Sequence, residues 1–163
     1  MSENRIEPCW PHVGPELAAE IVALWRQEKA IDTPAEMQRR SAEAVCVARG
    51  ADGTLLGVAT AQAQLIPFLG QPMYYLRAFV AANARRGILG YRLMRGAQET
   101  LAADAASAAP ASAAIGIFLE LENPAFARDG DRAVWRSGFA YAGITPRGLQ
   151  RRIWYFPEAR LRR

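Results

Sequence analysis

Long apolar runs are missing from this sequence of 163 residues. No uninterrupted apolar stretch approaches the roughly 20 residues that a membrane-spanning helix needs, so we expect no membrane partner. The first ten residues, MSENRIEPCW, also lack the basic and then apolar pattern of a secretory signal peptide. Together these two absences predict a cytoplasmic protein.

Cysteine and histidine are scarce as well. The two cysteines, Cys9 and Cys46, lie far apart and in no metal-ligand spacing, which argues against a disulfide framework and against a zinc site. We therefore predict buried or idle thiols and no metal. The single histidine, His12, follows Pro11 near the N-terminus, where a surface position is a simpler interpretation than a catalytic one.

Lysine is nearly absent, since Lys29 is the only one, and arginine supplies almost all of the positive charge. The 20 basic residues outnumber the 16 acidic ones and give a formal net charge of +4. Such a balance suits nucleic acid, an acidic substrate or a phosphate-bearing ligand. Because no basic stretch alternates with aromatic residues and no nucleic-acid-binding signature is present, we expect no nucleic-acid partner. A basic nucleic-acid-binding domain is an alternative function that the net charge alone would allow.

The composition that remains is that of one globular domain, with 51% hydrophobic and 22% charged residues. Apolar spacing predicts a helix over residues 15–30. A second, shorter helix is expected to begin at Thr33 as N-cap, with Pro34 in its first turn. A longer helix is predicted to run to about Ala105, and a short one over residues 132–137.

The remaining apolar segments are typical of β-strands. They cover residues 44–48, 55–66, 73–80, 114–121, 139–144 and 149–156. The strand–helix–strand step from Met73 to Leu121 should form a right-handed parallel crossover. We therefore predict an α/β fold in which a single mixed central sheet is flanked by helices on both faces.

The hexapeptide RRGILG, residues 85–90, stands where the strand 73–80 passes into the long helix. A helix start leaves about four backbone N–H groups without partners and carries roughly half a positive charge, so it attracts anions. Gly87 and Gly90 remove obstruction there, and two arginines add positive charge. A plain strand-to-helix turn would also accept glycine. However, glycine in the first helical turn costs up to about 1 kcal/mol relative to alanine, which favours the close approach of a phosphate.

The segment FVAANARRGILGYRL resembles the acetyl-CoA-binding motif of the GNAT superfamily of N-acetyltransferases. Val80 matches the motif's valine, Arg85 its Arg or Gln position and Gly90 its final small residue. Ala82 replaces the usual proline, and Ile88 stands where the first motif glycine is expected. Further along, FLELEN and VWRSGF resemble the family's later strand with its asparagine and the helix that ends in Gly-Phe.

The resemblance covers about the whole chain and implies a single GNAT-like acyltransferase domain over residues 1–163. It implies acetyl-CoA as co-substrate and direct transfer of the acetyl group to a primary amine, carried by a small molecule or a peptide. Pantetheine would lie in a gap where the strands 73–80 and 114–121 splay apart. The implied cofactor-binding residues are Ala78, Phe79, Val80, Arg85, Arg86, Gly87, Ile88, Leu89, Gly90, Tyr91 and Asn123. Whether the protein forms a homodimer is left open.

Glu120 is our candidate for the general base, because its Leu-Glu-Leu setting is similar to a strand glutamate that some family members use. The alternative is a sheet-surface glutamate paired with an arginine, and Glu122 has a weaker claim to the same role. The family often places a tyrosine four residues before the Gly-Phe pair to protonate the departing thiolate. That position holds Val134 in this chain, and Tyr141 or Tyr91 could substitute.

Three further points stay open. Asn123 resembles the family's cofactor-contacting asparagine, although an Asn-Pro turn explains it nearly as well. The departures at Ile88 and Val134 favour an alternative function, a catalytically weak or inactive GNAT-like module that binds acyl-CoA or a protein partner. Several large aromatic residues could line an acceptor pocket or lie in the core, namely Trp25, Trp135, Trp154, Tyr74 and Tyr75.

Overall fold

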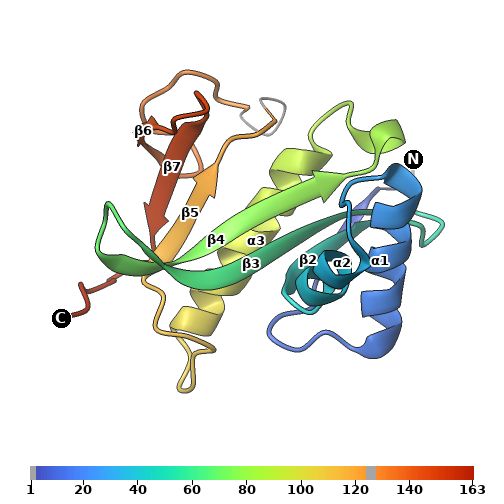
Figure 1. The fold of residues 1–163 in the computed structure, drawn as a ribbon, viewed down its shortest axis with the longest axis horizontal. Coiled ribbons are helices and arrows are strands. Elements are labelled where there is room, and N and C mark those ends of the chain that lie inside the picture. The colour runs from blue at the N-terminus through green and yellow to red at the C-terminus, as the bar shows by residue number, and fades with distance from the viewer. Residues whose placement is uncertain (1–2, 124–127) are drawn as a thin grey trace.

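The computed structural model of the chain describes residues 3–123 and 128–163. Its strands form one seven-stranded sheet in the order β1-β2-β3-β4-β5-β7-β6 (Figure 1). The strands are β1 (Arg5–Pro8), β2 (Ala44–Arg49), β3 (Leu55–Ile66), β4 (Gln71–Val80), β5 (Gly116–Glu120), β6 (Ala140–Ile144) and β7 (Gln150–Tyr155). The helices of the described residues are α1 (Pro15–Glu28), α2 (Pro34–Ser41) and α3 (Leu89–Ala105), with a 3-10 turn, η1 (Ala82–Ala84).

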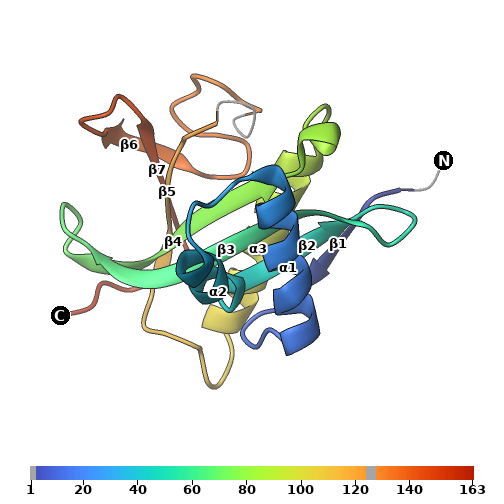
Figure 2. The same cartoon turned by 45° about the vertical axis from the view of Figure 1, so that its right-hand side comes forward.

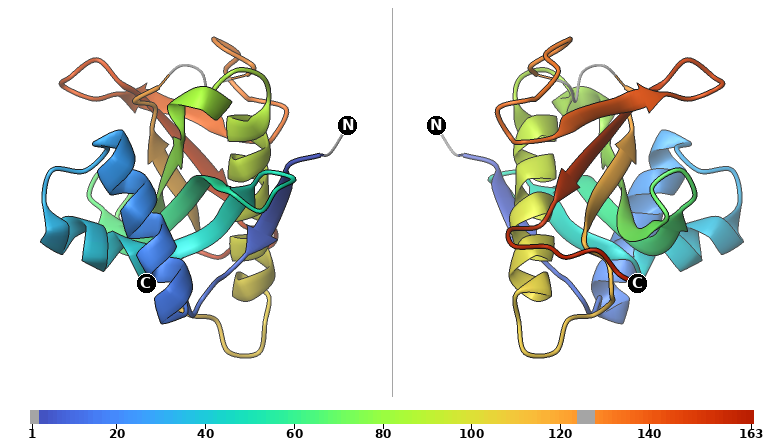
Figure 3. Two further views of the ribbon diagram at one scale, coloured as in Figure 1. Left: turned by 90° about the vertical axis from the view of Figure 1, so that its right-hand side faces the viewer. Right: turned by 90° about the vertical axis from the view of Figure 1, so that its left-hand side faces the viewer.

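Helices cover both faces of the sheet, as the sequence predicts. Figure 2 and Figure 3 show α1 and α2 on one face and α3 on the other. The buried residues divide accordingly. The core under α3 includes Leu93 and Leu101 of the helix and Ala48 of β2, whereas the core under α1 and α2 includes Trp25 and Val47. Because side chains alternate along a strand, β2 contributes to both cores, and its continuous apolar sequence follows from burial on both faces.

Local signals place the helix ends as predicted. The Thr33 side-chain oxygen accepts a hydrogen bond from the backbone N–H of Glu36 at 3.2 Å, which caps α2. Helix α1 ends one residue before Lys29, whose φ of 53° is left-handed. The predicted end of the long helix at Ala105 is confirmed.

Strand pairing confirms the mixed sheet. Strands β3 and β4 form a long antiparallel pair whose register runs without a break from Gly57↔Val80 to Ile66↔Gln71. Strands β4 and β5 pair in parallel, and α3 forms the connection between them. The crossover therefore brings the hexapeptide before α3 and the end of β5 to the same end of the sheet (Figure 1).

Two sequence expectations were wrong. The strand β1, RIEP, was not predicted, because four residues that include proline carry no clear alternation. It pairs with β2 at the sheet edge, from Arg5↔Arg49 to Pro8↔Cys46. The short helix expected over residues 132–137 does not form. Turns and an isolated bridge between Val134 and Ala140 take its place.

A buried arginine accounts for the missing helix. The Arg152 side chain, 1% exposed, donates to the carbonyl oxygens of Arg132 and Ala133 at 2.8 and 3.0 Å. Its guanidinium also lies 4.4 Å from the centroid of the Trp135 ring. Because these carbonyls are hydrogen-bonded across to β7, they do not accept the i→i+4 bonds of a helix. This tertiary contact was not visible in the local sequence.

Candidate active site

The sheet opens between β4 and β5. Their parallel pairing is confined to Tyr74↔Ile117 and Tyr75↔Phe118, and beyond these pairs the two strands diverge (Figure 1). Meanwhile β4 stays paired with β3 as far as Val80, and β5 stays paired with β7 as far as Glu120. The edge of β4 that faces β5 is therefore left without a strand partner in the second half of β4, which suits an extended ligand that can bind in the manner of a strand.

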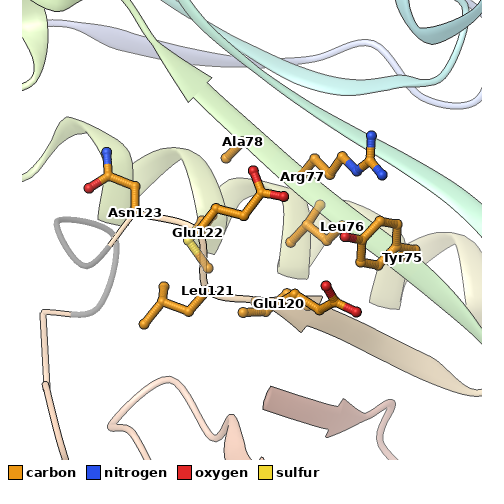
Figure 4. A pocket seen from close by; sticks show the side chains of 10 residues that line it. Tyr75, Leu76, Arg77, Ala78, Glu120, Leu121, Glu122 and Asn123 are labelled. Carbon is orange, nitrogen blue, oxygen red and sulfur yellow. The ribbon is translucent and has the colours of Figure 1, made fainter. Parts of the chain in front are cut away.

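A pocket occupies this gap, and we call it the β4–β5 opening (Figure 4). Its lining residues are Tyr75, Leu76, Arg77, Ala78, Met94, Leu119, Glu120, Leu121, Glu122 and Asn123. Met94 of α3 and the strand residues Leu76, Ala78 and Leu119 are apolar, whereas the charged side chains are Arg77 of β4 and Glu120 and Glu122 at and just after the end of β5. An apolar floor with a few polar groups at its rim is typical of small-molecule sites.

Glu120 lies on the face of the sheet opposite α3. Its neighbours Leu119 and Phe118 show the alternation, since Leu119 belongs to the core under α3 and Phe118 belongs to a separate cluster with Ile66 and Met73. Figure 4 shows the Glu120 carboxylate directed toward Tyr75, across the base of the opening. A carboxylate at this place can accept a proton from a group held between the two strands.

A second pocket adjoins the opening, and we call it the aromatic pocket. It is lined by Gln64, Ile66, Pro67, Phe68, Tyr75, Phe118, Glu120 and Arg151. Two residues, Tyr75 and Glu120, line both pockets. The Tyr75 and Phe118 rings are stacked, with centroids 5.7 Å apart, and Phe68 meets Phe118 edge-on at 5.9 Å. The two pockets therefore meet at Glu120.

Arg151 is the residue opposite Glu120 in the ladder between β5 and β7. Within the described residues, no ion pair joins the two side chains. The Arg151 guanidinium lies instead 5.1 Å from the centroid of the Phe68 ring, and its Nη1 reaches the carbonyl oxygen of Ile144 at 3.4 Å. The alternative interpretation of Glu120 was a surface glutamate paired with an arginine. Arg151 stands at the position that such a pair requires, but the two side chains form no ion pair within the described residues.

The start of α3 presents free backbone donors. Gly87 has a φ of +100°, a conformation that side chains rarely adopt, and it turns the chain into the helix. Ile88 is the N-cap residue and supplies no side-chain hydrogen bond; the first backbone bond runs from the Arg92 N–H to the Ile88 carbonyl oxygen, at 2.9 Å. The amide hydrogens of the first turn, including that of Gly90, therefore point out of the helix start.

The two arginines of the hexapeptide are placed differently. The Arg85 side chain folds back over the end of β4, where its Nε donates to the Val80 carbonyl oxygen at 2.9 Å and its guanidinium lies 5.5 Å from the centroid of the Phe79 ring. The Arg86 side chain is exposed. Arg85 thus fastens the loop to β4, in addition to the positive charge that the sequence suggested.

The structure brings only part of the predicted cofactor set into the opening. Ala78 and Asn123 line it, together with the candidate base Glu120. Phe79 and Val80 lie on β4 past the opening. The hexapeptide, which includes Leu89, follows them in the chain, between η1 and the first turn of α3. Tyr91 lines a different pocket, together with residues such as Arg128 and Trp135. Pro124, on which the Asn-Pro turn interpretation depends, lies outside the described residues.

Several site residues were not assigned a role from the sequence. They are Arg77 and Met94 in the opening and Phe68 and Arg151 in the aromatic pocket. Arg77 could have been found, because strand alternation places it on the same face as Tyr75. Met94 and Arg151 reach the site from α3 and β7, and no spacing within one element predicts their position.

The aromatic residues proposed for an acceptor pocket and the tyrosines proposed as general acid lie in different parts of the structure. Trp25 and Trp135 are buried in the core, and Trp154 packs against it. Val134, at the position of the family tyrosine, is 55% exposed. Neither Tyr141 nor Tyr91 lines the opening, whereas the phenol of Tyr75 lies beside Glu120 (Figure 4).

Burial weakens both thiols as acids, since Cys46 is buried and Cys9 is half-buried. Burial raises the pKa of Cys9 to about 11 and that of Cys46 to about 12. At neutral pH both are therefore protonated and poor nucleophiles. In the described part of the chain, no group of three or more His, Cys, Asp or Glu side chains could hold a metal ion, and no helix is long and apolar enough to cross a membrane.

Comparison with known proteins identifies the fold. No protein-family model matches the sequence, and no curated protein matches it. Solved structures do match. A GCN5-related N-acetyltransferase from Kribbella flavida aligns with a TM-score of 0.63 at 18% identity, covering 93% of this chain and 97% of that one. A phosphinothricin acetyltransferase of the GNAT superfamily from Sinorhizobium meliloti, solved with acetyl-CoA, gives 0.64 at 16%, covering 97% and 90%.

A GNAT family N-acetyltransferase from Escherichia coli, solved with CoA, aligns with a TM-score of 0.60 at 16% identity and covers 96% of this chain and 82% of that one. By its architecture this chain is a mixed α/β protein whose sheet opens between two parallel neighbouring strands. More particularly, it has the fold of the GNAT superfamily of N-acetyltransferases, as the motif resemblance implied.

Proposed function

We propose that this protein is an acetyl-CoA-dependent N-acetyltransferase that moves an acetyl group directly to a primary amine. The observation that carries the proposal is the β4–β5 opening, where an unpartnered strand edge leads to an uncapped helix start. Matching structures include proteins solved with CoA or acetyl-CoA, which supports acyl-CoA as the ligand of this fold.

The chain's residues fit such a ligand in two places. The backbone of Ala78, Phe79 and Val80 would hydrogen-bond the pantetheine arm along the free edge of β4. The amide hydrogens of the first turn of α3 would bind the diphosphate, with Arg86 adding positive charge. Asn123, at the end of β5, lines the opposite wall of the opening.

The reaction proposed is a direct transfer with both substrates bound. The amine nitrogen forms a bond to the thioester carbonyl carbon, the carbon–sulfur bond breaks, and the thiolate leaves with its electron pair. A backbone N–H near Phe79 or Val80 would stabilise the negative charge that develops on the carbonyl oxygen. Holding both reactants in the opening supplies much of the acceleration. The high pKa of Cys9 and Cys46 supports a route without a cysteine nucleophile.

Glu120 is proposed as the general base. A lysine-like amine has a pKa of about 10.4, so at pH 7 less than about one molecule in a thousand is neutral. Glu120 lies where the opening meets the aromatic pocket, so it can take the proton from an amine held there. A thiol has a pKa of about 8.5, which makes the thiolate a fair leaving group without a dedicated acid.

A second candidate is a catalytically weak or inactive module that binds acyl-CoA. It is favoured by Ile88, whose side chain is 49% exposed at the helix start where the family motif has glycine. A side chain there would hold a diphosphate further from the backbone amides. The two candidates predict the same ligand and differ in turnover.

Thermal unfolding with and without acetyl-CoA tests the common ligand. At a hundredfold excess over the dissociation constant, binding adds about 2.7 kcal/mol, which corresponds to roughly 5–10 °C in Tm for a chain of this size. Thiol release from acetyl-CoA is then measured against a panel of amines. Stabilisation with turnover supports the enzyme and stabilisation without turnover supports the binding module. No stabilisation at millimolar acetyl-CoA contradicts both.

A further inference from the structure

The aromatic pocket contains a cation that the fold leaves without an anion. Arg151 reaches it from β7, and its only hydrogen bond among the described residues is the 3.4 Å contact from Nη1 to the Ile144 carbonyl oxygen. That distance is beyond the usual range for an N–H···O bond. The Nε of Arg151 is buried, and nothing in the described chain accepts a hydrogen bond from it. Arg151 is half-buried, and a guanidinium with so few protein acceptors leaves its terminal N–H groups to water or to a ligand.

Glu120 is the acidic residue opposite Arg151 in the β5–β7 ladder, and it does not serve as that acceptor. As cross-strand neighbours on β5 and β7, the two side chains begin close together. They diverge because Glu120 turns toward Tyr75 (Figure 4), whereas the Arg151 guanidinium stacks on Phe68. One pocket therefore has a free carboxylate at the end that meets the β4–β5 opening and a free guanidinium elsewhere on its wall.

We propose that the amine acceptor also carries a carboxylate, which Arg151 binds while Glu120 faces the amine. This inference rests on the proposed acetyl transfer and names the substrate class for the same site. A guanidinium binds a carboxylate with two parallel N–H···O bonds, and the terminal nitrogens of Arg151 make only the 3.4 Å contact to Ile144 among the described residues, so they can donate to such a pair. Because Glu120 and Arg151 line the same pocket, one small acceptor molecule can present an amine to the first and a carboxylate to the second.

The walls of the pocket define the rest of the acceptor. The rings of Phe68, Phe118 and Tyr75 line the same pocket as the two charged groups. Such walls favour an apolar or aromatic body over a polar one. The acceptor class is therefore an apolar amino-carboxylate, such as a free amino acid with a large side chain. A peptide amine whose carboxyl group is blocked lacks the group that Arg151 binds.

Binding is tested first, with probes that carry no amine. Calorimetry on the CoA-saturated protein compares 3-phenylpropanoate with 3-phenylpropanamide, which differ only in the charge and hydrogen-bonding of one group. We expect the acid to bind at least tenfold more tightly than the amide. The Arg151→Gln variant should lose this difference, and Arg151→Lys should keep part of it. Equal binding of the two probes, or no binding of the acid at 10 mM, would refute the proposal.

Turnover is tested next, by thiol release with L-phenylalanine and L-phenylalaninamide. The ratio of their kcat/KM values is compared between variants, so that the different amine basicities cancel. Arg151→Gln should lower this acid-to-amide ratio at least tenfold. The matched control Arg160→Gln removes the same charge from an exposed arginine in a different pocket and should leave the ratio unchanged.

The outcomes separate this inference from the proposed function. If acetyl-CoA binds and the amide is acetylated with the same kcat/KM as the acid, the proposed acetyltransferase function is supported and the proposed carboxylate site is wrong. If Arg151→Gln keeps the wild-type ratio, Arg151 does not recognise the acceptor. If the wild-type protein does not bind CoA, the proposed function itself is wrong. Circular dichroism of each variant shows whether the fold is retained, and Arg151→Lys keeps the test decisive if Arg151→Gln does not fold.

Discussion

Glu120 and Arg151 face each other across the β5–β7 ladder, yet in the described chain their side chains form no ion pair and point to different parts of one pocket. An opposite-charge pair at such positions contributes roughly 0.2–1 kcal/mol to stability. The separation of the two charges leaves both available to a ligand, and this availability is the basis of the site proposed above.

The first prediction concerns Glu120. If Glu120 removes the proton of the acceptor amine, Glu120→Gln should lower kcat/KM about a hundredfold near pH 7, which is within the usual range for a general base. The ratio of wild-type to variant rates should fall as pH rises, because more of the amine is then already neutral. The measurement is kcat/KM for thiol release between pH 6 and pH 10.

The matched control for that experiment is Glu122→Gln. Glu122 lines the same opening and is exposed just after the end of β5. The substitution therefore removes a negative charge from the same pocket. We expect less than a fivefold effect with no trend in pH. A rate ratio for Glu120→Gln that stays flat across the pH range would remove Glu120 from the role of base.

The second prediction concerns the helix start. A bulky cation at Gly90 would fill the space next to the free amide hydrogens of α3, so Gly90→Arg should abolish acetyl-CoA binding while the fold is retained. Calorimetry measures the affinity and circular dichroism measures the fold. The control is Ala103→Arg, which adds the same side chain to an exposed position of the same helix. Unchanged affinity in Gly90→Arg would mean that the diphosphate binds elsewhere.

The third prediction concerns stability. Arg152 is almost fully buried and donates to the carbonyl oxygens of Arg132 and Ala133. Replacing it with leucine removes the donor to the Arg132 carbonyl, leaves the Ala133 carbonyl with only the Tyr141 N–H, and removes the stacking on Trp135, so we expect a loss of roughly 3 kcal/mol. For a chain of this size that lowers Tm by about 6–12 °C.

The appropriate comparison for Arg152→Leu is Arg147→Leu, at an exposed turn between β6 and β7. That substitution should change Tm by less than about 2 °C, because surface changes away from special contacts have small effects. Equal shifts for the two variants would show that Arg152 does not hold the 132–137 segment in place.

The fourth prediction follows from the thiols. Burial raises the pKa of Cys9 to about 11 and that of Cys46 to about 12, above the ordinary value of 9.0. Above pH 9 the unfolded chain therefore loses thiol protons that the folded chain keeps. The stability that the thiols contribute is complete below pH 9 and is lost as pH rises toward the folded values, by up to roughly 1.4 kcal/mol per pH unit for each thiol.

Urea unfolding at pH 8, 9 and 10 measures this slope. The double variant Cys9→Ala and Cys46→Ala should show a smaller fall in the free energy of unfolding over the same range. In addition, both native thiols should react slowly with a disulfide reagent at pH 8 and rapidly in denaturant. Fast reaction of the folded protein would contradict the burial of the thiols. Slow reaction also means that the thiol-release assay measures CoA with little background.

Much of the fold was readable from the sequence, because its signals are local. Thr33 and Pro34 predicted the start of α2, and the apolar pattern of residues 55–66 predicted the full length of β3. The order of strands and helices implied the parallel crossover between β4 and β5. The motif around Arg85 and Gly90 implied the acetyltransferase fold that the solved structures then identified.

The two sequence predictions that were wrong concern segments whose structure depends on contacts with distant parts of the chain. The edge strand β1 is stabilised by its pairing with β2 and carries little pattern of its own. The expected helix over residues 132–137 gave way to turns because Arg152 holds its carbonyl groups. Local propensity is weak, and a tertiary hydrogen bond of ordinary strength is enough to override it in so short a segment.

Some features of the candidate site were likewise predictable from the sequence, and others depend on the tertiary structure. The sequence by itself determined that Gly87 turns the chain into α3 and that Glu120 shares a strand face with Phe118, and its motif resemblance implied that β4 and β5 splay apart. Only the tertiary structure decided that the splay begins after Tyr75, and that Arg151 lies beside Glu120 without pairing with it. The physical reason is that periodicity fixes the face of an element on which a side chain lies, whereas the distance between side chains of different elements is set by how the sheet twists and packs.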